Sequence, residues 1–269
     1  MKKSMYEQQE NMVCKNNDII RKSRFSLSVQ QNKMLLYLIS QIKPTDDVDT
    51  VYEISLRDFC RVCGIQADSG KNVKDAKKAI QQIADKSIWV RQQNESEILI
   101  RWFNRIRLNK RTGRFEVTFH EDMLPYLYDL RYNYVQYKLK NVLVMKSQYS
   151  IRLYELLKSY QFMEKEIEFT VEELKIRLNA QKYERYTDFR RYVLEPAVAD
   201  INKASDICVR YETYKGGERG VKGIWFRIEE PNIYDRIARR AIANQKLADK
   251  AKKRENKTDE KANCPEGTK

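Results

Sequence analysis

The segment "YTDFRRYVLEPAVADINKASDICVRYETYKGGERGVKGIWFRI", residues 186–228, predicts a helix followed by two strands. A helix over 186–203 places a row of apolar residues on one face: Phe189, Val193, Leu194, Ala197, Val198 and Ile201. After it, "SDICVR" (205–210) begins a strand, and Gly216-Gly217 form the turn of a β-hairpin whose second strand ends the segment. The order helix, strand, turn, strand therefore decides how this part of the chain folds.

Two more helices precede this segment. "SIRLYELLKSY" (150–160) is amphipathic, and "EIEFTVEELKIRL" (166–178) reads as a short strand, Thr170 as N-cap, and a second helix. Three helices followed by a β-hairpin are typical of the winged form of the helix-turn-helix. In that unit the third helix enters the major groove of DNA and the hairpin follows the backbone.

The first half of the chain repeats this plan. "NKMLLYLISQI" (32–42) matches 150–160, and "VYEISLRDFCRVC" (51–63) matches 166–178, with Ser55 in place of Thr170. A third helix over 70–86 ends in "KSIWVR" (86–91), which matches "SDICVR", and "EILIRWFNRIRLNKRTGRFEVTFH" (97–120) predicts a hairpin around residues 111–113. Matched positions lie 115 to 119 residues apart, as in the pairs Ser55 and Thr170, Tyr37 and Tyr154, and Val90 and Val209.

We therefore predict an α+β fold of two tandem winged-helix domains related by an internal repeat, with a charged, partly disordered C-terminal tail. The first domain spans 17–133 and supplies dimerisation and DNA backbone contacts. The second spans 134–230 and binds DNA sequence-specifically. Residues 1–16 are predicted to be a flexible leader, and 231–269 a tail that is first helical and then disordered.

Charge favours a polyanionic partner. Lys and Arg number 52 against 38 Asp and Glu, a formal net charge of +14. Because the chain has no amphipathic membrane helix and no apolar run near the roughly 20 residues of a membrane span, nucleic acid is favoured over a lipid surface. The chain could also be a merely basic protein without such a partner. We expect double-stranded DNA as partner, no membrane, and a cytoplasmic location.

Metal, cofactor and nucleotide sites are not expected. Five cysteines are an odd number that suits a reducing compartment, and the lone CxxC of Cys60 and Cys63 lies on an apolar helix face without a second ligand pair. "GIQADSGKN" (64–72) resembles a phosphate-binding loop, but Gly64 and Gly70 enclose five residues rather than four and Lys71 is followed by Asn72. The stretch instead predicts the turn of the helix-turn-helix, with Gly64 ending one helix and Asp68 or Ser69 capping the next.

The third helix of the second unit carries the candidate base-reading residues. Its outward face near the N-terminal end holds Arg185, Asp188, Arg191 and Tyr192, with Arg190 at the edge of the apolar row. Arginine can contact guanine O6 and N7 in a bidentate manner, and aspartate can accept from cytosine N4. The alternative is a solvated basic helix face.

The third helix of the first unit carries lysines instead. Its apolar row is Val73, Ala76, Ile80 and Ile83, and its outward residues are Lys71, Lys74, Lys77, Lys78 and Gln81. Because lysine is a flexible point charge, these residues predict contacts to phosphate rather than to a particular base. The hairpins add further candidates for backbone contact, although surface charge alone would explain several of them: Arg105, Arg107, Lys110, Arg111 and Arg114 in the first unit, and Lys215, Arg219 and Lys222 in the second.

Three segments together resemble a known family. "NNDIIRKSRFSLSVQQNKMLLYLISQI" (16–42), "KSQYSIRLYELLKSY" (146–160) and residues 186–228 are similar to the theta-type plasmid replication initiators that bind iterons, over about residues 16–230. The resemblance implies that two winged-helix domains embrace repeated origin sequences and that the start of the second domain's third helix reads bases, through Arg185, Asp188, Arg190 and Arg191. It also implies dimerisation through the first domain, monomers that initiate replication with host proteins such as a helicase or initiator, and dimers that repress the protein's own gene. The lysine-rich helix of the first domain carries no base-reading signature that can be transferred.

Two other functions compete with this interpretation. A nicking initiator needs a metal-binding histidine pair beside its tyrosine nucleophile, and this chain has one histidine, His120, which we expect to end a strand or cap a helix. We therefore expect no enzymatic activity. A transcriptional repressor could be built from the same two domains, although two unlike units in one chain suit an asymmetric repeat better than a palindrome.

Overall fold

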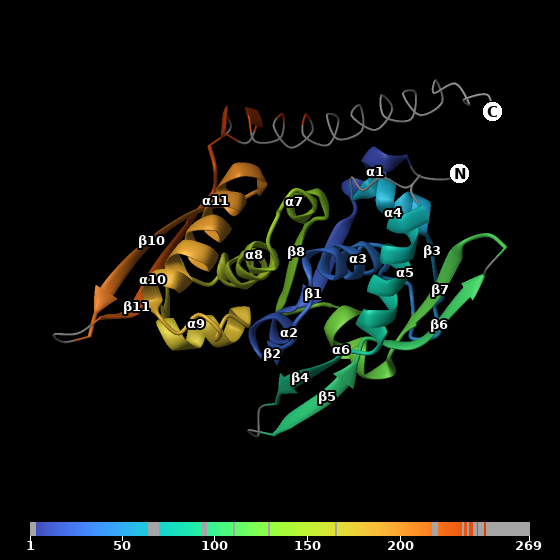
Figure 1. Ribbon diagram of the computed structural model, residues 1–269, viewed down its shortest axis with the longest axis horizontal. Coiled ribbons are helices and arrows are strands. Elements are labelled where there is room, and N and C mark those ends of the chain that lie inside the picture. Colours follow the sequence, from blue (N-terminus) through green and yellow to red (C-terminus); the bar gives the residue numbers. More distant parts are fainter. Residues whose placement is uncertain are drawn as a thin grey trace, which may run out of the picture.

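A computed structural model describes residues 4–63, 70–92, 96–109, 111–128, 130–164, 166–216 and 220–232, together with 234, 235, 237, 238, 241 and 245. Figure 1 shows two units side by side, with the first half of the chain on the right and the second half on the left. None of the helices in the described part of the chain is long and apolar enough to cross a membrane.

The second unit contains three helical segments and a three-stranded sheet. Helices α8 (Gln148–Tyr160) and α9 (Val171–Leu178) precede a third helical segment over 186–204, and strands β9 (Glu166–Thr170), β10 (Cys208–Lys215) and β11 (Val221–Glu229) pair in the order β10-β11-β9. One face of the sheet is buried and carries four apolar side chains that pair across β9 and β11: Ile167, Phe169, Ile224 and Phe226. Because side chains alternate along a strand, the other face lies open to solvent.

The first unit has the same plan. Helices α3 (Val29–Ile39), α4 (Leu56–Val62) and α5 (Gly70–Ala84) accompany strands β3 (Tyr52–Ser55), β6 (Phe103–Asn109) and β7 (Arg114–Phe119), which pair in the order β3-β7-β6. Ser55 and Thr170 each accept a hydrogen bond from the backbone N–H three residues later, so each begins the second helix of its unit as predicted. The internal repeat and the tandem winged-helix fold are confirmed.

The predicted repeat is wrong for one strand. "KSIWVR" forms β4 (Ser87–Arg91), which pairs with β2 (Ser23–Arg24) and β5 (Glu97–Arg101) instead of opening the wing as β10 does. The first wing is the separate hairpin β6–β7, so Val90 and Val209 are not equivalent. The hairpin β4–β5 is an insertion, and Val90 is buried because its strand packs on the first unit's own core.

Residues 4–16 are not the flexible leader that the sequence predicts. Residues 5–9 form α1 (Met5–Gln9), and β1 (Met12–Asn16) pairs antiparallel with β8 (Tyr134–Lys138). The alternation of β1 buries Val13 in the core, and Lys15 is buried against Glu155 of α8. Short segments join these elements: α2 (Asn17–Arg21), the 3-10 turn η1 (Glu121–Met123), α6 (Leu124–Leu127) and α7 (Lys140–Leu143). The domain boundary at 133/134 stays a prediction, and the tail beyond residue 245 lies outside the described residues.

Candidate nucleic-acid interface

The third helical segment of the second unit contains a wide turn. It runs as α10 (Tyr186–Phe189), a π-helical turn η2 (Arg190–Leu194) and α11 (Glu195–Ala204). Pro196 has no N–H to donate to the carbonyl of Tyr192 and its ring crowds that carbonyl, which favours a wider turn. An α-helix advances 400° in four residues, so a row of residues four apart drifts by about 40° at each step.

The wide turn absorbs part of that drift and keeps one row of side chains buried. Phe189, Val193, Ala197 and Ile201 are spaced by four and are all at most 1% exposed. The predicted apolar row is therefore confirmed, with Val198 half-buried beside it. Leu194, next to Val193, is buried with this row, whereas Arg190, Arg191 and Tyr192 between its first two members are exposed.

The predicted base-reading residues lie at the start of this segment. Arg185 is the N-cap residue of α10 and is exposed, Asp188 is half-buried, and Arg190 and Arg191 are exposed. Arg190 Nε lies 2.8 Å from Glu195 Oε1, and this hydrogen bond raises the pKa of the Arg190 guanidinium. Arg190 is thus held by a carboxylate of its own helix.

A pair of stacked tyrosines next to these residues was not predicted from the sequence. The rings of Tyr183 and Tyr192 stack with centroids 6.1 Å apart at 23°, and the Arg191 guanidinium carbon lies 5.4 Å from the centroid of the Tyr192 ring. Tyr192 is 53% exposed, and Tyr149 of α8 packs edge-on against the ring of Tyr183. Tyr183 comes from the loop before α10, so helical spacing gives no signal that it would meet Tyr192. The stack presents an exposed ring and a cation side by side.

The third helix of the first unit, α5, confirms its predicted apolar row. Ala76, Ile80 and Ile83 are at most 1% exposed, and α5 is tied to α3 where Gln31 Nε2 donates to Gln82 Oε1 at 2.8 Å. The outward lysines Lys74, Lys77 and Lys78 and also Gln81 are exposed, as predicted. The side chains of Lys71 and Val73 and the predicted turn over 64–69 lie outside the described residues.

The hairpin cations are divided between exposed and paired side chains. Arg105, Arg107 and Arg111 are exposed, Arg107 lies 3.8 Å from Glu116, and the half-buried Arg114 lies 2.5 Å from Glu53. On the second wing Lys215 and Lys222 are exposed, whereas Lys110 and Arg219 lie outside the described residues. Because exposed ion pairs contribute little stability, these arginines can exchange a carboxylate for a phosphate at small cost.

The histidine and the CxxC cysteines have structural roles. His120 is the N-cap of η1, where its Nδ1 accepts from the backbone N–H of Asp122 at 3.3 Å, and Cys60 and Cys63 are buried in the core. The predicted capping role of His120 and the predicted apolar helix face of Cys60 and Cys63 are confirmed. No cluster of three His, Cys, Asp or Glu side chains suited to a metal ion occurs among the residues that the structure describes.

The two third helices lie on opposite sides of a shared centre. In Figure 1, α5 and the α10–α11 segment flank the central helices α3 and α8 and run in opposite directions.

Two family models match the chain, one for each unit: "Initiator Replication protein, WH1" over residues 12–158 and "Initiator Rep protein, WH2" over 170–228. The chain belongs to the initiator replication protein family. This initiator therefore carries the two winged-helix domains of that family in tandem.

Known relatives are distant in sequence. A replication initiation protein of Escherichia coli is 24% identical over 195 residues, which are 69% of this chain, and the chain spans 60% of the length of that relative. An uncharacterized 27.6 kDa protein of Escherichia coli is 20% identical over 220 residues, covering 76% of this chain and 90% of that protein. The solved structure of Pi initiator protein in complex with iteron DNA superposes with a TM-score of 0.67 at 20% identity, covering 83% of this chain and 99% of that one. This last likeness shows a shared fold.

Proposed function

We propose that this initiator binds direct repeats, or iterons, in double-stranded DNA at a plasmid origin as a monomer and recruits host replication proteins there. The observation that carries the proposal is the presence of two third helices in one chain, each with exposed cations, on opposite sides of a shared centre. Membership of the initiator family supports it, and so does the iteron DNA held by the Pi initiator of the same fold. The protein acts by binding and not by cleaving DNA.

In this proposal the third helices of the two units have different roles in DNA binding. The start of α10 reads bases through Arg185, Asp188, Arg190 and Arg191, since arginine and aspartate match the donor and acceptor pattern of a G·C pair. Helix α5 and the hairpin cations hold phosphates, since lysine supplies charge without a fixed geometry. The second domain then sets sequence choice, and the first sets affinity and register.

We also propose that the first domain forms a homodimer through β5, and that this dimer represses the protein's own gene. Strand β5 is an edge strand, because within the described residues its sheet has the order β2-β4-β5. Two neighbouring apolar side chains of this strand are exposed, Leu99 at 50% and Ile98 at 38%, and Trp89, opposite Leu99 on β4, is 45% exposed. An exposed apolar edge strand is a template for pairing with another chain, here a second copy.

Footprinting and plasmid maintenance test the proposed function. The full chain should protect short direct repeats near its gene, and the gene with its flanking DNA should maintain a plasmid that has no other origin. Absence of protected repeats, or binding that ignores sequence, would contradict iteron binding. Protection of the repeats without plasmid maintenance would identify a repressor instead of an initiator.

A further inference from the structure

A cleft of about 940 Å³ opens between the two units. Its floor is the end of α2 and strand β2, one wall is the end of β4 with the start of β5, and the other wall is α9. In Figure 1 these elements lie at the lower edge of the molecule, between α10 on one side and α5 on the other. The described residues that line the cleft are Arg21, Lys22, Ser23, Arg24, Arg91, Gln92, Glu97, Glu173, Ile176 and Arg177. Among them, Ile176 is the one apolar residue. Small-molecule sites are mostly apolar, so this lining indicates a charged ligand.

The lining carries an excess of positive charge. Five of its residues are Arg or Lys and two are Glu, and Asp18 beside Lys22 adds a third carboxylate next to the cleft. The local balance therefore stays positive by two charges. A concave surface with a net positive charge focuses its field, so an anion is attracted here more strongly than to a flat surface of the same net charge.

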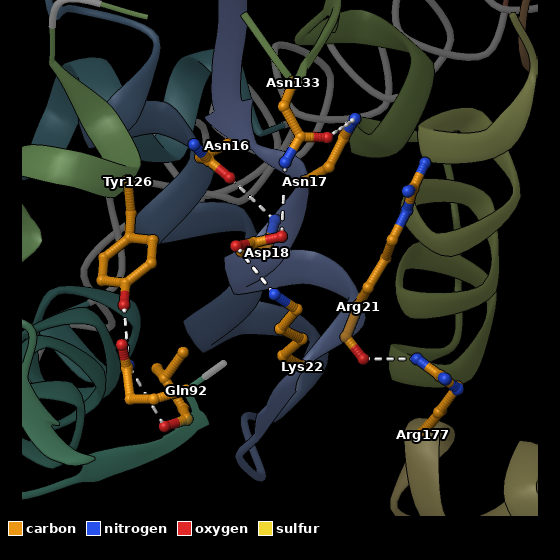
Figure 2. A network of polar contacts seen from close by, with 10 residues as sticks. Asn16, Asn17, Asp18, Arg21, Lys22, Gln92, Tyr126, Asn133 and Arg177 are labelled. Carbon is orange, nitrogen blue, oxygen red and sulfur yellow. Dashed lines mark hydrogen bonds and ion pairs between the residues drawn. The ribbon is translucent and has the colours of Figure 1, made fainter. Parts of the chain in front are cut away.

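Two arginines connect the floor of the cleft to neighbouring helices. Arg177 of α9 donates to the backbone carbonyl of Arg21, a link between the two units that Figure 2 shows, and Arg177 Nε lies 2.9 Å from Glu173 Oε1. Arg21 Nε donates to Ser159 Oγ at 3.0 Å, and its guanidinium carbon lies 3.8 Å from the centroid of the Tyr160 ring. These contacts hold α9, one wall of the cleft, against α2 on its floor.

Two cations of the rim are held in exposed ion pairs. Figure 2 shows the ion pair of Lys22 and Asp18. Lys22 Nζ lies 2.9 Å from Asp18 Oδ2 with both side chains 34% exposed, and the half-exposed Arg24 pairs with Glu97. Arg91 is exposed at the end of β4. Exposed ion pairs of this kind are weak, and a charge-assisted hydrogen bond to phosphate is comparable or stronger, so a phosphate can replace the carboxylates.

We propose that this cleft binds backbone phosphates of the DNA segment that lies between the part read by α10 and the part held by α5. The inference rests on the proposed function, because it needs one DNA duplex to pass both third helices. The cleft then contributes affinity and a fixed spacing between the two units, and it carries no base preference. A free phosphate has the same chemistry as the backbone and is the other source of anion that the experiment must separate.

The test compares two triple variants of the full chain. The cleft variant is Lys22→Gln with Arg24→Gln and Arg91→Gln, and the control is Lys138→Gln with Arg210→Gln and Arg227→Gln, which removes the same charge from exposed positions outside the cleft. Affinity for a repeat is measured against salt concentration, on ordinary DNA and on DNA whose central phosphates are neutral methylphosphonates. The cleft variant should bind on the order of tenfold to a hundredfold more weakly than the control, with a salt slope smaller by up to about 0.9 for each lost phosphate contact. Neutral central phosphates should weaken the unmodified protein and leave the cleft variant unchanged.

Each other outcome overturns the inference in a different way. If both triple variants bind repeats alike while the unmodified protein keeps its sequence preference, the cleft does not hold DNA and the proposed function stands. If the unmodified protein fails to bind any repeat, the proposed function falls and the cleft inference with it. If calorimetry with inorganic phosphate shows binding that only the cleft variant loses, and DNA affinity is unchanged, the cleft is a site for a free anion.

Discussion

Arg191 and Arg190 are neighbours on the reading helix with different partners. Arg190 is paired with Glu195, whereas the guanidinium of Arg191 lies over the exposed ring of Tyr192. We predict that Arg191→Ala loses about 1–3 kcal/mol of discrimination at one or two base pairs, because a bidentate contact to guanine is lost. Binding to repeats with single base changes measures this. Arg191→Lys is the control, since it keeps the charge without the planar fork, and an equal loss on every sequence would contradict base reading.

Lys74 should behave differently because it is an exposed point charge on α5. We predict that Lys74→Ala weakens binding to all sequences alike and lowers the salt slope by about 1, as expected for one lost phosphate contact. Lys203, an exposed lysine at the far end of α11, is the matched control and should give little change. A loss at Lys74 that depends on one base pair would mean that the first domain also reads sequence.

The ion pair of Lys15 and Glu155 is buried, with side chains 3% and 2% exposed. Tyr137 also donates its hydroxyl to Glu155, and burial lowers the pKa of Lys15. We predict that Glu155→Gln lowers the free energy of unfolding by about 3–5 kcal/mol, since it leaves a buried ammonium without its carboxylate. Urea denaturation measures the loss. Glu53→Gln, which breaks an exposed pair with Arg114, should change stability little, and an equal effect of the two variants would contradict a buried pair.

At the scale of elements, the third helices were predictable and the β-pairings were only partly so. Helical spacing identified Phe189, Val193, Ala197 and Ile201 as one buried face, because burial repeats with the helix. The sequence could not tell that β4 pairs with β2 and β5, since alternation shows that a strand has a buried face and not which strand lies beside it. Strand β1 could not be predicted from the polar N-terminal residues for the same reason, because Val13 and Lys15 are buried only when the strand pairs with β8.

The edge strand β5 allows a test of the proposed dimer. We predict that Leu99→Lys shifts the protein to a monomer, because a lysine on an edge strand opposes pairing with a second chain. Sedimentation equilibrium measures the shift, and binding of the monomer to a repeat should persist. Trp225→Lys is the matched control, since Trp225 is 41% exposed on β11, the central strand of the other sheet. A dimer that survives Leu99→Lys but not Trp225→Lys would place the interface on the second domain.

At the scale of the whole molecule, the excess of positive charge can be counted from the sequence, but the places where cations from the two halves of the chain come together cannot be predicted from it. Arg177 and Arg21 are 156 residues apart and join at the floor of the cleft. Nearby, Arg152 of α8 donates to the backbone carbonyl of Ser23 at 2.8 Å, and burial lowers its pKa to about 10. No local pattern signals such pairs, because they depend on how the second unit packs on the first. These contacts make the two units one packed body.

A packed join between unlike units predicts a fixed spacing and order within each repeat. Arg177 and Arg152 tie the second unit to the first unit's Arg21 and Ser23, so the two third helices cannot rotate independently around a duplex. We predict that inserting 5 base pairs into the middle of a repeat abolishes specific binding, because it turns the two halves by about half of the roughly 10.5 base pairs of one helical turn. Exchanging the order of the halves should abolish it too, since α5 and α10 carry different side chains. Gel-shift titration measures both, with 5 base pairs added outside the repeat as control; unchanged binding after the internal insertion would mean that the units move apart in solution and that the join is not rigid.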